Sequence, residues 1–352
     1  MLAERLTAQL LAGPPARDPV EVARRLLAVQ AQDPRGARLA VRARSAGLSA
    51  ADVDHALSEG RSLVITWLNR GTLHLVASED YPWLQALTAP SHLTATMRRL
   101  SQEGVSADDA ERGVAVVCAA LADDGPLTRE GLGSRVEAAG IRTKGQALIQ
   151  ILALACLRGL TVRGPVVEAG HAYVLVRDWL GEPPQVDRER ALAELARRYL
   201  AWHGPADDRD LAKWAGLPLR EVRAGLTTIA PELAEREDGL SALRGLAPAA
   251  ELPEPKLLGA FDPLLLGWRS REPVLGRFAR RVTVGGMFRP FALVAGRAAA
   301  TWRMPAGEVV LQPFGRSPRP ARRCSTEMRP TWCAFSAAEG TGGMLDHEPL
   351  LD

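Results

Sequence analysis

The chain has 352 residues, a formal net charge of only +3 and 24% charged residues. This length is sufficient for two or three compact units with a substantial core. The near balance of charge excludes a uniformly basic, histone-like DNA binder. Three of the 44 basic residues are lysines, so the other 41 are arginines. The arginine bias is consistent with phosphate recognition, although GC-rich coding, which also explains the abundant Ala, Gly and Pro, accounts for most of it.

The cysteines and the hydrophobic runs indicate a reduced, cytoplasmic protein. No cysteine belongs to a CxxC pair or has a companion histidine at ligand spacing, so we expect neither a disulfide framework nor a zinc site. The longest apolar run, residues 147–157, is too short to cross a bilayer. Glu4 and Arg5 interrupt any signal-peptide pattern at the N-terminus. The four cysteines are Cys118, Cys156, Cys324 and Cys333.

Residues 1–106 are predicted to form the first unit. Asp18 is a favourable N-cap and Pro19 a favourable first helical residue, so a helix begins there. Pro34 disfavours helical backbone at the preceding residue, and this helix must therefore end around residues 30–32. Three helices followed by a hairpin are the order of a winged helix. The predicted elements are a helix from Leu2, the helix from Pro19, a helix over 51–60 and an extended segment over 63–76, interrupted at 70–71.

Residues 107–186 and 187–252 are predicted to form two further winged-helix units. In each, a helix-turn-helix precedes a short extended pair. An Asp-Gly-Pro-Leu turn and a His-Gly-Pro-Ala turn occupy equivalent places, which is a weak internal repeat. The predicted helices are 111–121, 132–139, 143–157, 191–202, 207–215 and 219–228, and the extended runs are 160–162, 172–176 and a pair within 233–243.

The pattern changes after residue 252. Short alternating runs separated by Gly and Pro over residues 253–316 predict antiparallel β structure, either a small barrel or a small sheet. Residues 317–352 have little periodicity, and we interpret them as a loosely ordered tail. The predicted class is therefore α+β, with tandem winged-helix motifs around a small C-terminal antiparallel β-barrel. The predicted strands are 282–284, 289–294, 298–302 and 309–311.

Two glutamines separated by one residue, Gln30 and Gln32, stand where the second helix must end. Positions i and i+2 point to different sides of a helix but share a face in an extended segment, so the two amides can converge here. An amide is not a useful base near neutral pH, but it can accept hydrogen bonds from a water and hold it. The alternative is a pair of solvated polar residues at a helix end. Asp33 could serve instead as a base, or simply as a turn residue.

A second polar group follows about forty residues later. If residues 66–76 are extended, Arg70, Thr72 and His74 share one face, which could turn toward DNA or toward the glutamines. The alternative is a half-buried strand with a solvated polar side, in which His74 is a hydrogen-bonded structural residue. Arginines also crowd the C-terminal β segment, either as phosphate contacts or as solvated strand residues. The candidate DNA-binding residues are Arg269, Arg271, Arg280, Arg281, Arg289 and Arg303.

Five stretches, taken together and in this order, carry a resemblance to a known family. They are LAVQAQ (27–32), TWLNRGTLHLV (66–76), LLGAFDPLLLGW (257–268), GGMFRP (285–290) and ATWR (300–303). With them the chain resembles the winged-helix DNA glycosylases of the AlkZ/YcaQ type over about residues 1–315. The resemblance implies three winged-helix motifs around a β-barrel with a DNA-sized channel. The family signature is Gln-x-Gln in its cross-link-unhooking branch and Gln-x-Asp in the other, which implies that Gln30 and Gln32 are catalytic.

The resemblance therefore implies a monofunctional DNA glycosylase for DNA repair. It would hydrolyse the N-glycosidic bond of bulky or cross-linked N7-alkylpurines in double-stranded DNA, as a monomer, without a metal or cofactor. An antibiotic adduct is one possible lesion, in which case the role is self-resistance. The alternative is a non-enzymatic winged-helix DNA-binding protein or transcription regulator. That alternative explains the helices and the arginines but leaves the Gln-x-Gln placement without a role.

Overall fold

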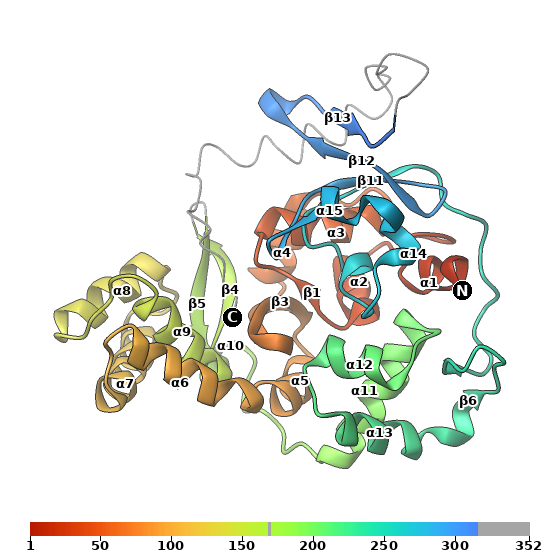
Figure 1. Cartoon of the computed structure of the whole chain (residues 1–352). Helices are drawn as coiled ribbons and strands as arrows, with labels where there is room; N and C mark the ends of the chain where they lie inside the picture. Colours follow the sequence, from red (N-terminus) through yellow and green to blue (C-terminus); the bar gives the residue numbers. More distant parts are fainter. Residues whose placement is uncertain (168–169, 316–352) are drawn as a thin grey trace.

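The computed structural model describes residues 1–167 and 170–315, so the predicted tail, residues 317–352, lies outside the described residues. Short helices surround a β-hairpin at the N-terminus (Figure 1). Helix α2 (Pro19–Leu26) begins as predicted, and the Asp18 side chain accepts a hydrogen bond from the Val20 N–H at 2.8 Å. The other elements are α1 (Leu2–Ala8), β1 (Val29–Gln30), α3 (Pro34–Ala43), α4 (Ala50–Leu57), β2 (Leu63–Leu68), η1 (Asn69–Gly71), β3 (Thr72–Ala77), α5 (Tyr81–Thr88), η2 (Pro90–His92) and α6 (Leu93–Gln102).

The end of α2 differs from the sequence prediction. The helix stops at Leu26 rather than around residues 30–32, because Leu27 adopts a φ of +63° and strand β1 follows at once. Helix α3, which the sequence analysis did not predict, then begins after the N-cap Asp33. The glutamine motif therefore lies in a short extended segment between two helices and not at a helix end.

Residues 107–252 contain one order of elements twice. In both copies the turn after the first helix leads to a residue that pairs with the following hairpin: Leu127 bridges Tyr173, and Ala206 bridges Ser241. The two units thus share an order and a pairing pattern, as their similar turns suggest. The elements are α7 (Ala107–Asp124), α8 (Arg129–Ala138), α9 (Ala147–Leu157), β4 (Thr161–Val167), β5 (Gly170–Leu175), α10 (Val176–Trp179), α11 (Arg188–His203), α12 (Asp208–Ala215), α13 (Leu219–Thr228), η3 (Ala230–Glu232), β6 (Leu233–Ala234) and β7 (Ala242–Leu243).

One antiparallel sheet of order β1-β3-β2-β4-β5 joins the first two predicted units. Its halves meet at β2 and β4, where Ile65 pairs with Arg163. A hydrophobic cluster consequently spans both units, from Leu10 to Leu175. A second cluster combines the N-terminal helices, α11 to α13 and the C-terminal segment. The boundaries at residues 106, 186 and 252 stay predictions, and the hydrophobic clusters extend across them.

The C-terminal segment forms an open sheet of order β13-β12-β11-β8. Its edge strands β8 and β13 do not pair with each other in the described part of the chain, so the predicted barrel is not confirmed. Four short strands are also fewer than a closed barrel usually needs. The α+β class holds. The elements are β8 (Lys256–Leu258), η4 (Pro263–Leu265), α14 (Glu272–Leu275), η5 (Gly276–Phe278), α15 (Ala279–Val282), β9 (Thr283–Val284), β10 (Met287–Phe288), β11 (Phe291–Val294), β12 (Arg297–Arg303), η6 (Pro305–Gly307) and β13 (Val310–Pro313).

A buried ion pair connects the N-terminal and C-terminal parts of the chain. Arg44, just after α3, donates to both carboxylate oxygens of Asp262 at 2.7 and 2.9 Å, and both side chains are fully buried. Figure 1 shows the strands β11 and β12 passing over α3 on the same side of the molecule. None of the described helices is long and apolar enough to cross a membrane.

Candidate active site

Three polar side chains form a row across the first three strands of the sheet. The register pairs Gln30 of β1 with His74 of β3, and His74 with Thr66 of β2. Residues directly opposite each other in an antiparallel pair present their side chains on the same face. Gln30, His74 and Thr66 are 8%, 2% and 0% exposed. The row is therefore a nearly enclosed polar strip on a sheet whose neighbouring positions are apolar.

The two glutamines use their amides differently. Gln30 makes no side-chain hydrogen bond with any described residue, and neither amide atom is fully enclosed. Gln32 is half-buried, and its Oε1 accepts a hydrogen bond from the Leu73 N–H at 3.3 Å. The Ala31 N–H donates to the Leu73 carbonyl at 2.7 Å, which holds the motif against β3. Both amides thus lie beside the start of β3, and Gln32 Oε1 retains one lone pair for another donor.

Asp33 has a structural role in this geometry. Its backbone is extended, and its carboxylate accepts a hydrogen bond from the Arg35 N–H at 3.0 Å as the N-cap of α3. Pro34 occupies the first helical position, where its missing N–H costs no hydrogen bond. The structure therefore favours the turn interpretation of Asp33 over the base interpretation.

His74 is held in one tautomer. Its Nδ1 lies 2.9 Å from the Thr72 carbonyl oxygen, which can only accept, so Nδ1 carries the proton and Nε2 keeps a lone pair. Burial lowers the pKa of His74 to about 3, and the positive charge of Arg70 adds to this effect. The ring is neutral at physiological pH. Nε2 accepts no hydrogen bond from the described residues and is not fully closed off.

The predicted face of Arg70, Thr72 and His74 is only partly correct. Thr72 and His74 lie two residues apart in β3, but Arg70 belongs to the η1 turn and has a φ of +57°. Its guanidinium donates to the Trp214 carbonyl of α12, so it reaches toward the third unit rather than along the strand. Burial lowers the pKa of Arg70 to about 10, and the charge of Arg271 contributes. Arg70 remains protonated at neutral pH.

Two residues near this turn were missed by sequence reasoning. Asn69 is fully buried, and neither atom of its amide has a partner among the described residues. His92 of η2 lies so close to Gly71 that a Cβ there would sit 3.3 Å from its Nδ1, and Gly71 has a φ of +69°. For Asn69, the only sequence signal was its position in an Asn-Arg-Gly turn. His92 stands in a segment without a recognisable motif.

Comparison with known proteins identifies the family. The model of the family described as "DNA glycosylase AlkZ-like" matches residues 23–328 of the chain. The protein belongs to the AlkZ-like DNA glycosylase family. A curated relative, the "Interstrand DNA cross-link repair glycosylase" of Streptomyces sahachiroi, is 29% identical over an alignment of 322 residues, and the match covers 84% of each chain. The solved structure of the Streptomyces sahachiroi DNA glycosylase AlkZ matches with a TM-score of 0.73 at 24% identity over 96% of each chain, which shows a shared fold.

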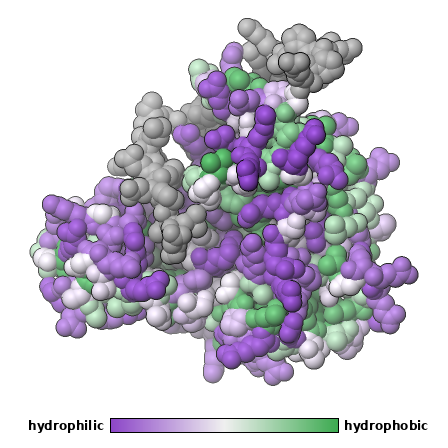
Figure 2. All heavy atoms as spheres, in the orientation of Figure 1, coloured by the Kyte–Doolittle hydropathy of each residue, from purple (hydrophilic) through white to green (hydrophobic). Residues whose placement is uncertain are grey.

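The predicted DNA-binding arginines of this AlkZ-like chain divide into two groups. Arg269 donates to Asp207 at 2.7 Å, and Arg271 donates to the Leu265 carbonyl at 2.8 Å and stacks on a phenylalanine ring. These two have internal partners. Figure 2 shows hydrophilic side chains gathered over the face that carries α15, α12 and α13. The exposed group, which forms no ion pair with another described residue, is Arg280, Arg281, Arg289 and Arg303.

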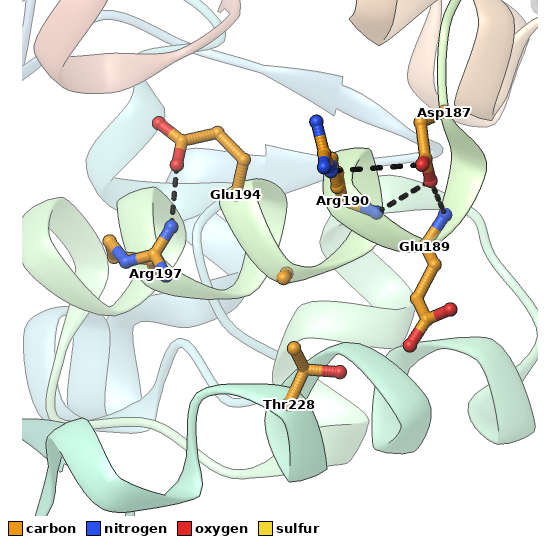
Figure 3. Close-up of a pocket in the computed structure, with 7 residues that line it drawn as sticks. Asp187, Glu189, Arg190, Glu194, Arg197 and Thr228 are labelled. Atoms are coloured by element: carbon orange, nitrogen blue, oxygen red, sulfur yellow. Dashed lines mark hydrogen bonds and ion pairs between the residues drawn. The ribbon is translucent and has the colours of Figure 1, made fainter.

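A separate hollow lies between α11 and α13 (Figure 3), and none of the candidate site residues lines it. Apart from the Glu189 carboxylate, its charged side chains have ion-pair partners. The Asp187 carboxylate caps α11 by accepting from the backbone at 3.0 and 3.1 Å, and Arg197 donates to Glu194 and to Glu232 at 2.7 Å. In this AlkZ-like chain, most charged groups of the hollow therefore have partners, whereas the Gln30 amide and the His74 Nε2 atom have none among the described residues. Within residues 1–167 and 170–315, no cluster of His, Cys, Asp and Glu could hold a metal.

Proposed function

We propose that the protein is a monofunctional DNA glycosylase that hydrolyses the N-glycosidic bond of bulky or cross-linked N7-alkylpurines in double-stranded DNA. Membership of the AlkZ-like family supports the reaction class, and the name of the Streptomyces sahachiroi relative supports the lesion class. The observation that carries the proposal is the position of Gln30 and Gln32 beside the start of β3, with Gln30 opposite His74.

The chemistry suits amides because the substrate supplies most of the driving force. A purine alkylated at N7 is a cation, so its bond to the sugar is already weakened and no strong general acid is needed. When that bond breaks, its electron pair neutralises the base and leaves an oxocarbenium-like sugar. Gln30 and Gln32 hold a water for attack on the anomeric carbon, and their carbonyl dipoles stabilise the developing positive charge. We propose that the reaction requires neither a metal nor a cofactor.

The exposed arginines provide the contact with DNA in this proposal. Phosphates recruit arginine without regard to sequence, which suits an enzyme that must find damage anywhere. A cross-linked base is attached to both strands and cannot swing freely out of the duplex. The enzyme must therefore reach the bond from a surface that accepts a duplex. We propose that one copy of the chain acts alone.

The test is base release from three defined duplexes. One contains 7-methylguanine, one a nitrogen-mustard cross-link and one uracil, and each is treated with alkali after incubation to reveal abasic sites. We expect strand breaks with the first two and none with uracil, whose glycosidic bond is not weakened. The Gln30→Ala/Gln32→Ala double variant is the matched control for contaminating activity. Comparable release of uracil would contradict the mechanism, and a shifted band without breaks would support the non-enzymatic DNA-binding alternative.

A further inference from the structure

We infer that His74 holds the hydrolytic water together with Gln30, with its Nε2 atom as the hydrogen-bond acceptor. This inference rests on the proposed function and adds an acceptor that is not an amide. It follows from the sheet register, the tautomer of the ring and the charges around it.

The register brings the two side chains together. Gln30 and His74 are directly opposite each other in β1 and β3, so their Cβ atoms are about 5 Å apart on one face. Each side chain has an unused acceptor: Gln30 has no hydrogen bond to a described residue, and His74 uses only Nδ1. Two acceptors that are neighbours on a rigid sheet can receive the two protons of one water. Gln32 lies two residues beyond the end of β1, and in this scheme its carbonyl dipole stabilises the developing positive charge.

The tautomer makes Nε2 the acceptor. The Thr72 carbonyl fixes the proton on Nδ1, so Nε2 cannot become a donor without losing that hydrogen bond or gaining a charge. Thr72 is itself held in place, since its hydroxyl donates to the Asn69 carbonyl at 3.3 Å. The turn between β2 and β3 therefore orients the ring that faces Gln30.

The charged and titratable groups around His74 oppose its protonation. Arg70 from η1 and His92 from η2 both lower the pKa of His74. Arg271 in turn acts on Arg70, and the charges of Arg271 and Arg70 both act on Lys213. Burial, followed by the charge of Arg70, lowers the pKa of His74 to about 3. The pKa of His92 is also lowered, first by burial and then by Arg70. The ring consequently remains an acceptor at pH values where an ordinary histidine becomes a donor.

A weak acceptor is sufficient for the step. As the water oxygen bonds to the cationic anomeric carbon, the water becomes strongly acidic. One O–H bond then breaks, and its proton transfers to Nε2 and forms a short-lived imidazolium. Because the pKa of the buried ring is low, this proton then passes to solvent. The base has already departed with the electron pair of the glycosidic bond, so atoms and charge balance without another reactant. His74 thus touches the reacting water and is a catalytic residue in this scheme.

Two substitutions separate this role from a structural one. His74→Asn keeps a donor near the Nδ1 position for Thr72 but has no acceptor at the Nε2 position. His74→Gln reaches the Nε2 position with an amide oxygen. We expect His74→Asn to slow single-turnover release of 7-methylguanine by roughly 10- to 100-fold with unchanged DNA affinity. We expect His74→Gln to retain most of the rate. A purely structural histidine predicts the reverse order, which would overturn the inference.

Two readouts on the wild-type protein complete the test. The single-turnover rate should be flat from about pH 5 to about pH 8, because the ring does not titrate there. NMR of protein labelled with ¹⁵N-histidine should show His74 as the Nδ1–H tautomer without DNA. Protonation near its ordinary pKa, or an Nε2–H tautomer, overturns the inference. Normal release by His74→Asn overturns the inference alone, whereas a wild type that releases no base overturns the proposed function and the inference together.

Discussion

Two polar regions of the molecule differ in how far their groups are satisfied. Most charges in the hollow between α11 and α13 are paired, Asp187 with Arg190 and Glu194 with Arg197 (Figure 3). The strip on β1 and β3 contains no carboxylate, and it leaves the Gln30 amide and the His74 Nε2 without partners among the described residues. Burying a polar group without a partner costs free energy.

This difference supports our proposal that the strip on β1 and β3 receives the ligand. A groove whose charges are already paired gains little from binding, because each new interaction must replace an existing one. Unsatisfied amides and an imidazole on a rigid sheet gain hydrogen bonds when water and substrate arrive. Polar groups without partners in native proteins are also often found at functional sites. In our proposal, unsatisfied hydrogen-bonding groups are therefore a better guide to function than the presence of a hollow.

The largest effect is expected from the glutamines. Gln30→Ala should lower the single-turnover rate of 7-methylguanine release by roughly 100-fold with an unchanged unfolding temperature, because its amide has no protein partner to lose. Gln32→Ala should lower the rate similarly and also destabilise the fold by about 1 kcal/mol, since the Leu73 N–H loses its acceptor. Rates and thermal unfolding are measured side by side. An unchanged rate in Gln30→Ala would remove it from the chemistry.

The next effect concerns the exposed arginines. Replacing Arg280 and Arg281 of α15 with alanine should weaken binding to undamaged duplex DNA. The slope of log affinity against log salt concentration should become shallower by roughly 0.9 for each phosphate that the protein no longer neutralises. Binding is titrated at several salt concentrations by fluorescence anisotropy. Arg190→Ala, in the hollow between α11 and α13, is the matched control and should leave the slope unchanged. Equal slopes in all the variants would show that Arg280 and Arg281 of α15 do not contact DNA phosphates.

A smaller effect is expected at Asp33, and it concerns stability rather than rate. Asp33→Ala removes the N-cap of α3 and should lower the free energy of unfolding by about 1 kcal/mol. Asp33→Asn supplies an equivalent cap and should be nearly neutral. Both variants should release 7-methylguanine at close to the wild-type rate. If Asp33→Asn instead lost as much activity as Gln30→Ala, the carboxylate would be the base and the amide scheme would be wrong.

The smallest effect is expected from the paired groove. Arg197→Ala breaks hydrogen bonds to Glu194 and Glu232 that are partly exposed to solvent. Such pairs contribute little to stability, so we expect a slight fall in the unfolding temperature and no change in base release or DNA affinity. A clear loss of either activity would show that the hollow takes part in function and would reverse the contrast between the two regions.

Capping residues and apolar spacing predicted much of the helical structure, because both depend only on residues that are neighbours in the sequence. Helix α13 has its predicted bounds of residues 219–228, and Asp18 caps α2 as expected. The same rules failed at Leu27, whose positive φ ends α2 early and is not signalled by a leucine. They also missed α3, because Pro34 is equally compatible with the end of one helix and the start of the next.

Long-range pairing explains the other differences. The strand character of Gln30 depends on its pairing with His74, forty-four positions away, and the shared sheet depends on Ile65 meeting Arg163. Neither pairing can be predicted from the sequence of one of the two segments alone. The spacing of Thr72 and His74 correctly placed both on one strand, but the turn at Arg70 redirected that side chain toward Trp214. Sequence reasoning thus predicted which of these residues share a strand better than it predicted their hydrogen bonds.

The buried ion pair between Arg44 and Asp262 limits how far the chain can be shortened from its C-terminal side. Arg44 follows directly after α3, the helix that starts beside the glutamine motif, and Asp262 begins a turn more than two hundred residues later. Helix α3, which follows the glutamine motif, is consequently joined by this ion pair to the C-terminal β-rich segment. A shortened protein that ended before residue 262 would leave the buried Arg44 guanidinium without its carboxylate partner. We therefore expect the N-terminal unit to depend on the β-rich segment for its stability.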